Sequence, residues 1–154
     1  MGIVTFSGGS FGNGTTIPGR GFARGIEPKE GGTMDEIVIP ISAASDIVTA
    51  RLAGREAAER AGFKSTDLIV VSTVISEMAR NIVESALPGE IAISICQESG
   101  KAGIVVIART SLTKEFHDLF FANRLRRSMD ECKINYKPGE TVLTMKKWVD
   151  VWAQ

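Results

Sequence analysis

STVISEMARNIVES, residues 72–85, has the periodicity of a helix with one buried face. Counting the residues just before it, its apolar side chains recur every three or four positions: Leu68, Val71, Ile75, Met78 or Ala79, and Ile82. Its polar side chains fall on the other side: Thr73, Glu77, Arg80, Asn81 and Glu84. We therefore expect a long helix whose back packs in the core and whose front is open.

Glu77 and Asn81 stand one turn apart on that open front, about 40° from each other around the helix axis. A carboxamide oxygen suits Mg²⁺, which prefers oxygen ligands, and a carboxylate one turn earlier could accept a hydroxyl proton. Arg80 beside them could contact phosphate oxygens. Because E-x-x-x-N is a common spacing, the pattern taken alone favours an ordinary solvated face.

The composition indicates one globular domain and excludes several classes of function. The chain has 154 residues and a formal net charge of zero, so it lacks the basic surplus of a nucleic-acid-binding protein. No apolar run reaches the roughly 18 residues of a membrane span, and we expect no secretory signal peptide. Cys96 and Cys132 fall in predicted strands, which favours free buried thiols and a reducing cytoplasm.

Residues 1–33 differ from the rest, because they hold ten of the sixteen glycines. We expect a flexible leader there, since such a segment buries too little apolar surface to fix its backbone. The glycines of GGSFGNG (8–14) suggest a phosphate-binding loop as an alternative, but no strand–loop–helix context follows. Residues 34–154 are expected to form a single domain.

The predicted elements alternate in a way that indicates an α+β protein. Strands are expected at 34–41, 90–97, 103–109, 132–136 and 141–148, and helices from Ser42 or Ser45 to about Ala61, from the capping cluster at 64–67 to the break at 87–89, and over 112–130. In the first helix, Ile47, Ala50, Leu52 and Ala57 or Ala58 would face the core. Trp148 and Trp152 are expected in the core, with an interface as the alternative. The order predicts a two-layer sandwich with helices on one face of a mostly antiparallel sheet.

Two longer segments carry a family resemblance. STVISEMARNIVESALPGEIAISI (72–95), followed by SGKAGIVVIA (99–108), resembles the anti-sigma-factor class of serine kinases in the GHKL ATPase superfamily, in particular the switch kinases of bacterial stressosomes. DIVTARLAGREAAERAGF (46–63), RRSMDECKI (126–134) and GETVLTMKKW (139–148) fit the same family. The resemblance implies a Bergerat-type sandwich, with helices on one face of a mixed sheet and nucleotide bound on the helical side.

The resemblance also implies roles for the side chains on the open helix front. Glu77 matches the presumed catalytic base of the family, and Asn81 matches the asparagine that holds Mg²⁺. Arg80 and Glu84, on the same face, are taken with Asn81 as nucleotide-binding residues. The implied cofactors are ATP and Mg²⁺. The implied partners are a STAS-domain protein, a downstream phosphatase or sigma-factor regulator, and a second copy of the chain as a homodimer.

The segment after Arg109 departs from the family pattern. The family carries a D-x-G-x-G box and a glycine-rich lid there, whereas this chain reads RTSLTKEFHDLFFANRLRR from 109 to 127. Thr110 stands about where the adenine-binding aspartate is expected, and no glycine occurs between Gly103 and Gly139. Three hypotheses remain at this point. The first is a serine/threonine kinase that uses Mg-ATP on a STAS-domain partner, and the second is a catalytically inactive, lid-less relative that acts as a protein-binding module. The third is an altered copy whose helix at 112–130 refills the core space left by the lid.

Overall fold

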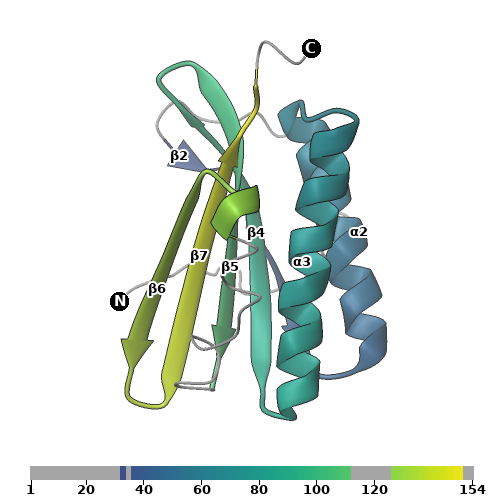
Figure 1. Cartoon of the computed structure of the whole chain (residues 1–154), viewed down its shortest axis with the longest axis vertical. Helices are drawn as coiled ribbons and strands as arrows, with labels where there is room; N and C mark the ends of the chain where they lie inside the picture. Colours follow the sequence, from purple (N-terminus) through teal and green to yellow (C-terminus); the bar gives the residue numbers. More distant parts are fainter. Residues whose placement is uncertain (1–31, 34–35, 112–125, 151–154) are drawn as a thin grey trace.

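The structure, a computed structural model, describes residues 32–33, 36–111 and 126–150. Most of the predicted leader therefore lies outside the described residues, as does the predicted helix at 112–130 apart from its last residues. The described chain forms two layers, with both long helices on one face of a sheet (Figure 1). This arrangement confirms the predicted α+β sandwich.

The sheet contains six strands in the order β2–β4–β5–β7–β6, and β3 also pairs with β4. The strands are β2 (Gly32–Thr33), β3 (Ile37–Ile41), β4 (Gly89–Glu98), β5 (Lys101–Thr110), β6 (Glu131–Lys137) and β7 (Glu140–Trp148). Every pairing between these strands is antiparallel. The short β2 and β3 share the free edge of β4, so Pro40 lies in an edge strand, as its missing N–H requires.

Tight turns set the register of the two hairpins. Ser99 and Gly100 join β4 to β5 with φ of 51° and 81°, as expected for a two-residue hairpin turn. Gly139, with φ of 79°, joins β6 to β7. The register of β4 and β5 places Ile93 opposite Val106 and Ile95 opposite Ile104, so their side chains share the helix-facing side.

Helix α2 (Ala44–Ala61) begins differently from the prediction. Its N-cap residue is Ala43, and neither Ser42 nor Ser45 caps it with a side-chain hydrogen bond. Instead the Asp46 carboxylate accepts hydrogen bonds from the backbone N–H groups of Ser42 and Ala43, both at 2.9 Å. The helix ends at Gly62, whose φ of 110° allows its N–H to bond the last carbonyl groups.

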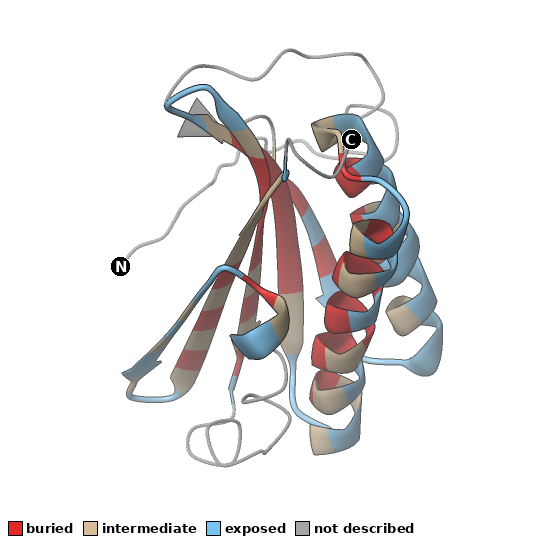
Figure 2. Ribbon diagram, turned by 45° about the horizontal axis from the view of Figure 1, so that its top comes forward, coloured by how far each residue is buried: buried red, intermediate tan, exposed pale blue. Residues whose placement is uncertain are grey.

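Small side chains let α2 pack closely on α3 (Thr66–Ser85). The buried residues of α2 are Ala50, Gly54, Ala57 and Ala58, and a Cβ at Gly54 would collide with Cδ1 of Ile75. The predicted core side chains of α3 are all buried: Leu68, Val71, Ile75, Met78, Ala79 and Ile82. They pack over isoleucines of β3 and β4, and Figure 2 shows this buried layer between the helices and the sheet.

Two predictions about the core are wrong. Leu52 is 55% exposed, because it lies on the outward side of α2. Trp148 is half-buried on the sheet face opposite the helices, where its ring lies over Gly103 and its Nε1 donates to Glu131 at 3.3 Å. Lys101 and Lys146 each place Nζ 5.2 Å from the centre of that ring. Trp152 lies outside the described residues.

The state of the two cysteines agrees with the prediction from the sequence. Cys96 and Cys132 are free thiols, on opposite faces of the sheet and with two strands between them. Burial raises the pKa of both thiols, so neither is an activated nucleophile. Among the described residues, no helix is both long enough and apolar enough to cross a lipid bilayer.

Candidate functional site

The open front of α3 carries the side chains that the sequence singled out. Arg80 and Glu84 are exposed, and Glu77 and Asn81 are half-buried at the edge of the helix's buried face. The apolar back of the helix holds this orientation, because Met78 and Ile82, which neighbour Glu77 and Asn81 in sequence, have no exposed surface. The helix therefore presents a carboxylate and a carboxamide from a rigid support.

Asn81 is held by a hydrogen bond to its own helix. Its Nδ2 donates to the backbone carbonyl of Glu77 at 3.2 Å. This bond uses the nitrogen side of the amide and leaves Oδ1 as the atom that could bind a cation. Glu77 and Asn81 are thus brought together one turn apart, as the helical spacing predicts.

Two serines occupy the side of α3 that faces α2. Ser72 donates its hydroxyl to the carbonyl of Leu68 at 2.8 Å, and Ser76 donates to the carbonyl of Ser72 at 2.9 Å. Both side chains are buried. Each hydroxyl is satisfied within the helix, so a short polar side chain can lie at the helix–helix contact without leaving an unpaired hydroxyl.

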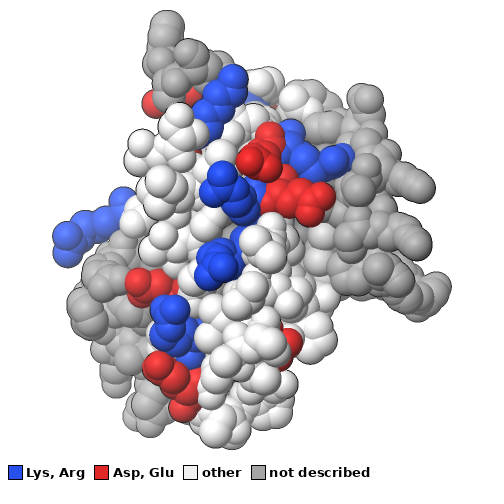
Figure 3. All heavy atoms as spheres, turned by 90° about the vertical axis from the view of Figure 1, so that its right-hand side faces the viewer, with Lys and Arg blue, Asp and Glu red and all other residues white. Residues whose placement is uncertain are grey.

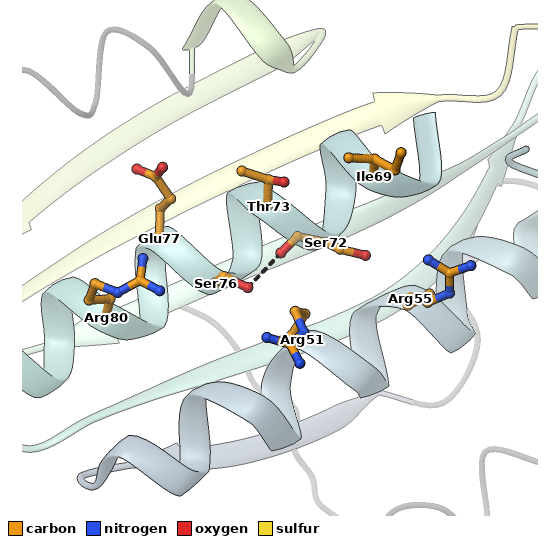
Figure 4. A pocket seen from close by; sticks show the side chains of 8 residues that line it. All are labelled: Arg51, Arg55, Ile69, Ser72, Thr73, Ser76, Glu77 and Arg80. Atoms are coloured by element: carbon orange, nitrogen blue, oxygen red, sulfur yellow. Dashed lines mark hydrogen bonds between the residues drawn. The ribbon is translucent and has the colours of Figure 1, made fainter. Parts of the chain in front are cut away.

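An open groove of about 390 Å³ runs between the two helices. It is lined by Arg51 and Arg55 of α2 and by Ile69, Ser72, Thr73, Ser76, Glu77 and Arg80 of α3. Figure 4 shows the two α2 arginines on the side of the groove opposite α3, and the carboxylate of Glu77 directed away from α2. Asn81 and Glu84 do not line this groove, so only Glu77 and Arg80 of the predicted site residues belong to it.

Two buried threonines lie at the end of β5 where the resemblance expects an aspartate. Thr110 is 2% exposed and stands directly opposite Thr141 of β7, which has no exposed surface. Both project from the helix-facing side of the sheet, the side of Ala108 and Leu143. Their hydroxyls can donate and accept, whereas an aspartate only accepts when ionised.

A curated relative decides the family. The chain is 33% identical to the serine/threonine-protein kinase RsbT of Bacillus subtilis (strain 168) over 130 residues, which cover 75% of this chain and 98% of that protein. This chain belongs to the RsbT family. No protein-family model matches it. The family assignment confirms the resemblance to the anti-sigma-type kinases drawn from residues 72–108.

The oxygen donors on α3, the Glu77 carboxylate and the Oδ1 atom of Asn81, are of the kind that Mg²⁺ prefers. Among the described residues, no three His, Cys, Asp or Glu side chains gather into a metal site. A Mg²⁺ ion held through the Oδ1 atom of Asn81 would therefore take its remaining oxygen ligands from water and phosphate, which is its usual coordination in nucleotide sites.

Sequence reasoning missed Arg51 and Arg55 as part of this RsbT-family surface. Their i, i+4 spacing puts them on one side of α2, but only the packing of α2 against α3 brings them to the groove. It also missed Thr141, because its pairing with Thr110 depends on the strand register.

Proposed function

We propose that this protein is a serine/threonine kinase that uses Mg-ATP to phosphorylate a STAS-domain protein in a cytoplasmic sigma-factor partner-switching pathway. The observation that carries the proposal is the pair formed by Glu77 and Asn81, held one turn apart on a buried helix in a chain of the RsbT family. A GHKL-type nucleotide site on the helical side of the sheet follows from the same proposal.

Each residue of the pair has one task. The Oδ1 atom of Asn81 would hold Mg²⁺, and the bound ion would neutralise charge on the phosphates. The Glu77 carboxylate would accept the proton of the substrate serine or threonine hydroxyl. The rigid back of α3 keeps both groups in position, and phosphoryl transfer depends mainly on such positioning and on electrostatic stabilisation.

Two further side chains would help to bind the nucleotide. The exposed Arg80 guanidinium would donate hydrogen bonds to phosphate oxygens, which favour planar, bidentate donors. Glu84 is exposed one turn after Arg80, near the end of α3. It would reach the nucleotide only through a polar sugar or base group, because its charge opposes phosphate.

Substitution of the pair separates binding from chemistry. Asn81→Ala should abolish Mg²⁺-dependent ATP binding in calorimetry, because it removes the cation ligand. Glu77→Gln should keep ATP binding and lower phosphoryl transfer by on the order of 10²–10⁴-fold, the usual contribution of a general base. Thr73→Ala, on the same exposed front, serves as the control. Full phosphoryl transfer by Glu77→Gln would contradict the assignment of the base.

The alternative is a protein-binding module without catalysis. It is favoured by Thr110 in the place of the expected aspartate and by the lack of glycine between Gly103 and Gly139, since glycines allow close approach of backbone to phosphate. The same calorimetry decides between the two functions. No heat at millimolar ATP, together with co-elution of the chain with a STAS-domain protein in the absence of nucleotide, would establish the module.

A further inference from the structure

The groove between α2 and α3 is strongly basic for a chain without net charge. Three guanidinium groups line it, from Arg51, Arg55 and Arg80, against the single carboxylate of Glu77. Figure 3 shows Lys and Arg side chains along the helical face of the molecule, with Asp and Glu side chains between them. The excess of positive charge is therefore a property of the groove lining, and not of the protein as a whole.

Among the described residues, salt bridges to these three arginines are weak or absent, so their guanidinium groups could bind a carboxylate from another molecule. Arg55 lies 3.8 Å from Glu59, but both side chains are about half exposed, at 49% and 52%, and such pairs contribute little to stability. Arg51 and Arg80 form no salt bridge with another described residue. An incoming carboxylate would meet two guanidinium groups, those of Arg51 and Arg80, that pair with no carboxylate of the described residues.

Exposed apolar side chains accompany the arginines. Ile69 lines the groove and is 61% exposed. On α2, Val48 and Leu52 stand one turn apart and are 43% and 55% exposed. Exposed apolar side chains that form a contiguous patch rimmed by charged groups are typical of protein–protein contact surfaces.

We propose that the α2–α3 groove is a docking site for an acidic, amphipathic helical segment of a protein partner. Carboxylates on one side of that segment would pair with Arg51 and Arg55, and its apolar face would cover Ile69 and Leu52. The small side chains of Ser72 and Ser76 on the α3 side of the groove leave space for side chains of a segment that lies across it. This is the helix-in-groove mode of recognition, with specificity supplied by charge.

The occupant is a protein segment because the groove combines charge with apolar surface. A nucleic acid would use the guanidinium groups but leave Ile69 and Leu52 exposed, and the zero net charge gives it no wider footprint. The proposal does not depend on kinase activity, since it rests on Arg51 and Arg55 of α2, whereas α3 carries the Glu77–Asn81 pair.

Fluorescence anisotropy with two labelled peptides tests the proposal. The first is a designed helical peptide with Leu at i, i+3, i+4 and i+7 spacing and Glu along its flanks; the second has Gln in place of every Glu. We expect the acidic peptide to bind the wild-type chain, and the Gln peptide to bind on the order of tenfold or more weakly. Binding should also weaken as salt is raised, a measurement that requires no variant.

Two charge reversals locate the binding surface. Arg51→Glu should weaken the binding of the acidic peptide on the order of tenfold or more, because an attraction becomes a repulsion. Lys133 is exposed on β6, at the far edge of the sheet. Its charge reversal, Lys133→Glu, should leave the affinity for the acidic peptide unchanged. Circular dichroism of both variants checks that they fold.

Three results would overturn the proposal. They are no binding of the acidic peptide to the wild-type chain, equal binding of the acidic and Gln peptides, and equal weakening by the two charge reversals. Tighter binding of a single-stranded oligonucleotide than of the acidic peptide, lost in Arg51→Glu, would assign the groove to nucleic acid and would overturn it as well.

Discussion

The carboxyl group of Glu36 is half-buried just before β3, and its Oε1 atom has no hydrogen-bond partner. Burial raises the pKa of this carboxyl from 4.5 to about 7; Arg109 opposes the rise and Glu90 adds to it. The folded state therefore holds this proton more tightly than the unfolded chain does. Through this group, the free energy of unfolding falls as pH rises from 4.5 to about 7 and is level above that range.

Glu36→Gln keeps the shape of the side chain and removes its charge. We expect the variant to have a larger free energy of unfolding than the wild-type chain at about pH 8, and the same value at about pH 4, where Glu36 is protonated in both states. Urea denaturation across this range measures the difference. Glu56→Gln on the exposed side of α2 is the control. A constant difference between Glu36→Gln and the wild type at all pH values would refute this account of Glu36.

At the residue scale, local spacing could be predicted and tertiary neighbours could not. The helical period is enough to place Glu77 and Asn81 one turn apart, and the hydrogen bond between Asn81 and the Glu77 carbonyl agrees with it. The contact of Arg51 with the groove depends on how two helices pack. The burial of Thr110 against Thr141 depends on a register between strands 31 residues apart in sequence.

At the scale of elements, turn chemistry and hydrophobic period predicted the secondary structure well. Both hairpins and both long helices lie where the sequence places them, because Gly62, Gly100 and Gly139 mark the breaks with positive φ. The start of α2 was mispredicted because two serines compete as caps, and the Asp46 carboxylate satisfies the backbone N–H groups instead. Leu52 was assigned to the core because α2 is rich in alanine, which gives a weak signal of which side is buried.

Gly54 sets the distance between α2 and α3, so its substitution tests their packing. Gly54→Ala places a methyl group on Cδ1 of the fully buried Ile75. Overpacking costs about 1–3 kcal/mol, and the better helix propensity of alanine offsets up to about 1 kcal/mol of that. We expect a net loss of up to about 2 kcal/mol in the free energy of unfolding.

The double variant Gly54→Ala with Ile75→Val separates the collision from other effects. Ile75→Val removes the atom that collides, so the two substitutions together should cost less than the sum of their separate effects. Urea denaturation of the two single variants and the double variant completes the cycle. Strict additivity would mean that Gly54 is not in contact with Ile75.

At the scale of the whole molecule, the two faces of the sheet have different chemistry. The face under the helices is apolar, with isoleucines from β3, β4 and β5 in one core. The opposite face carries ion pairs, among them Arg109 with Glu90 at 3.0 Å and Lys146 with Glu98 at 3.5 Å. The alternation of strand residues therefore explains why both helices lie on one side, and why a nucleotide site and a docking groove would share that layer.

The two proposed surfaces of α3 can be separated by a thermal-shift experiment. If the chain binds Mg-ATP, ligand at a hundred times Kd adds about 2.7 kcal/mol to the stability and raises Tm by on the order of 5–10 °C. We expect this shift in the wild-type chain and equally in Arg51→Glu, because Arg51 belongs to the docking groove. It should vanish in Asn81→Ala, whose cation ligand is missing.

The acidic peptide should give the reverse pattern in the same experiment. It should stabilise the wild-type chain and Asn81→Ala but not Arg51→Glu, because Asn81 does not line the groove. If Arg51→Glu instead lost the nucleotide shift, the α2 arginines would belong to the phosphate site, and the positive charge of the groove would serve ATP and not a protein partner. Opposite responses of the two variants to the two ligands would mean that one helix, α3, supports two independent binding surfaces on a common buried back.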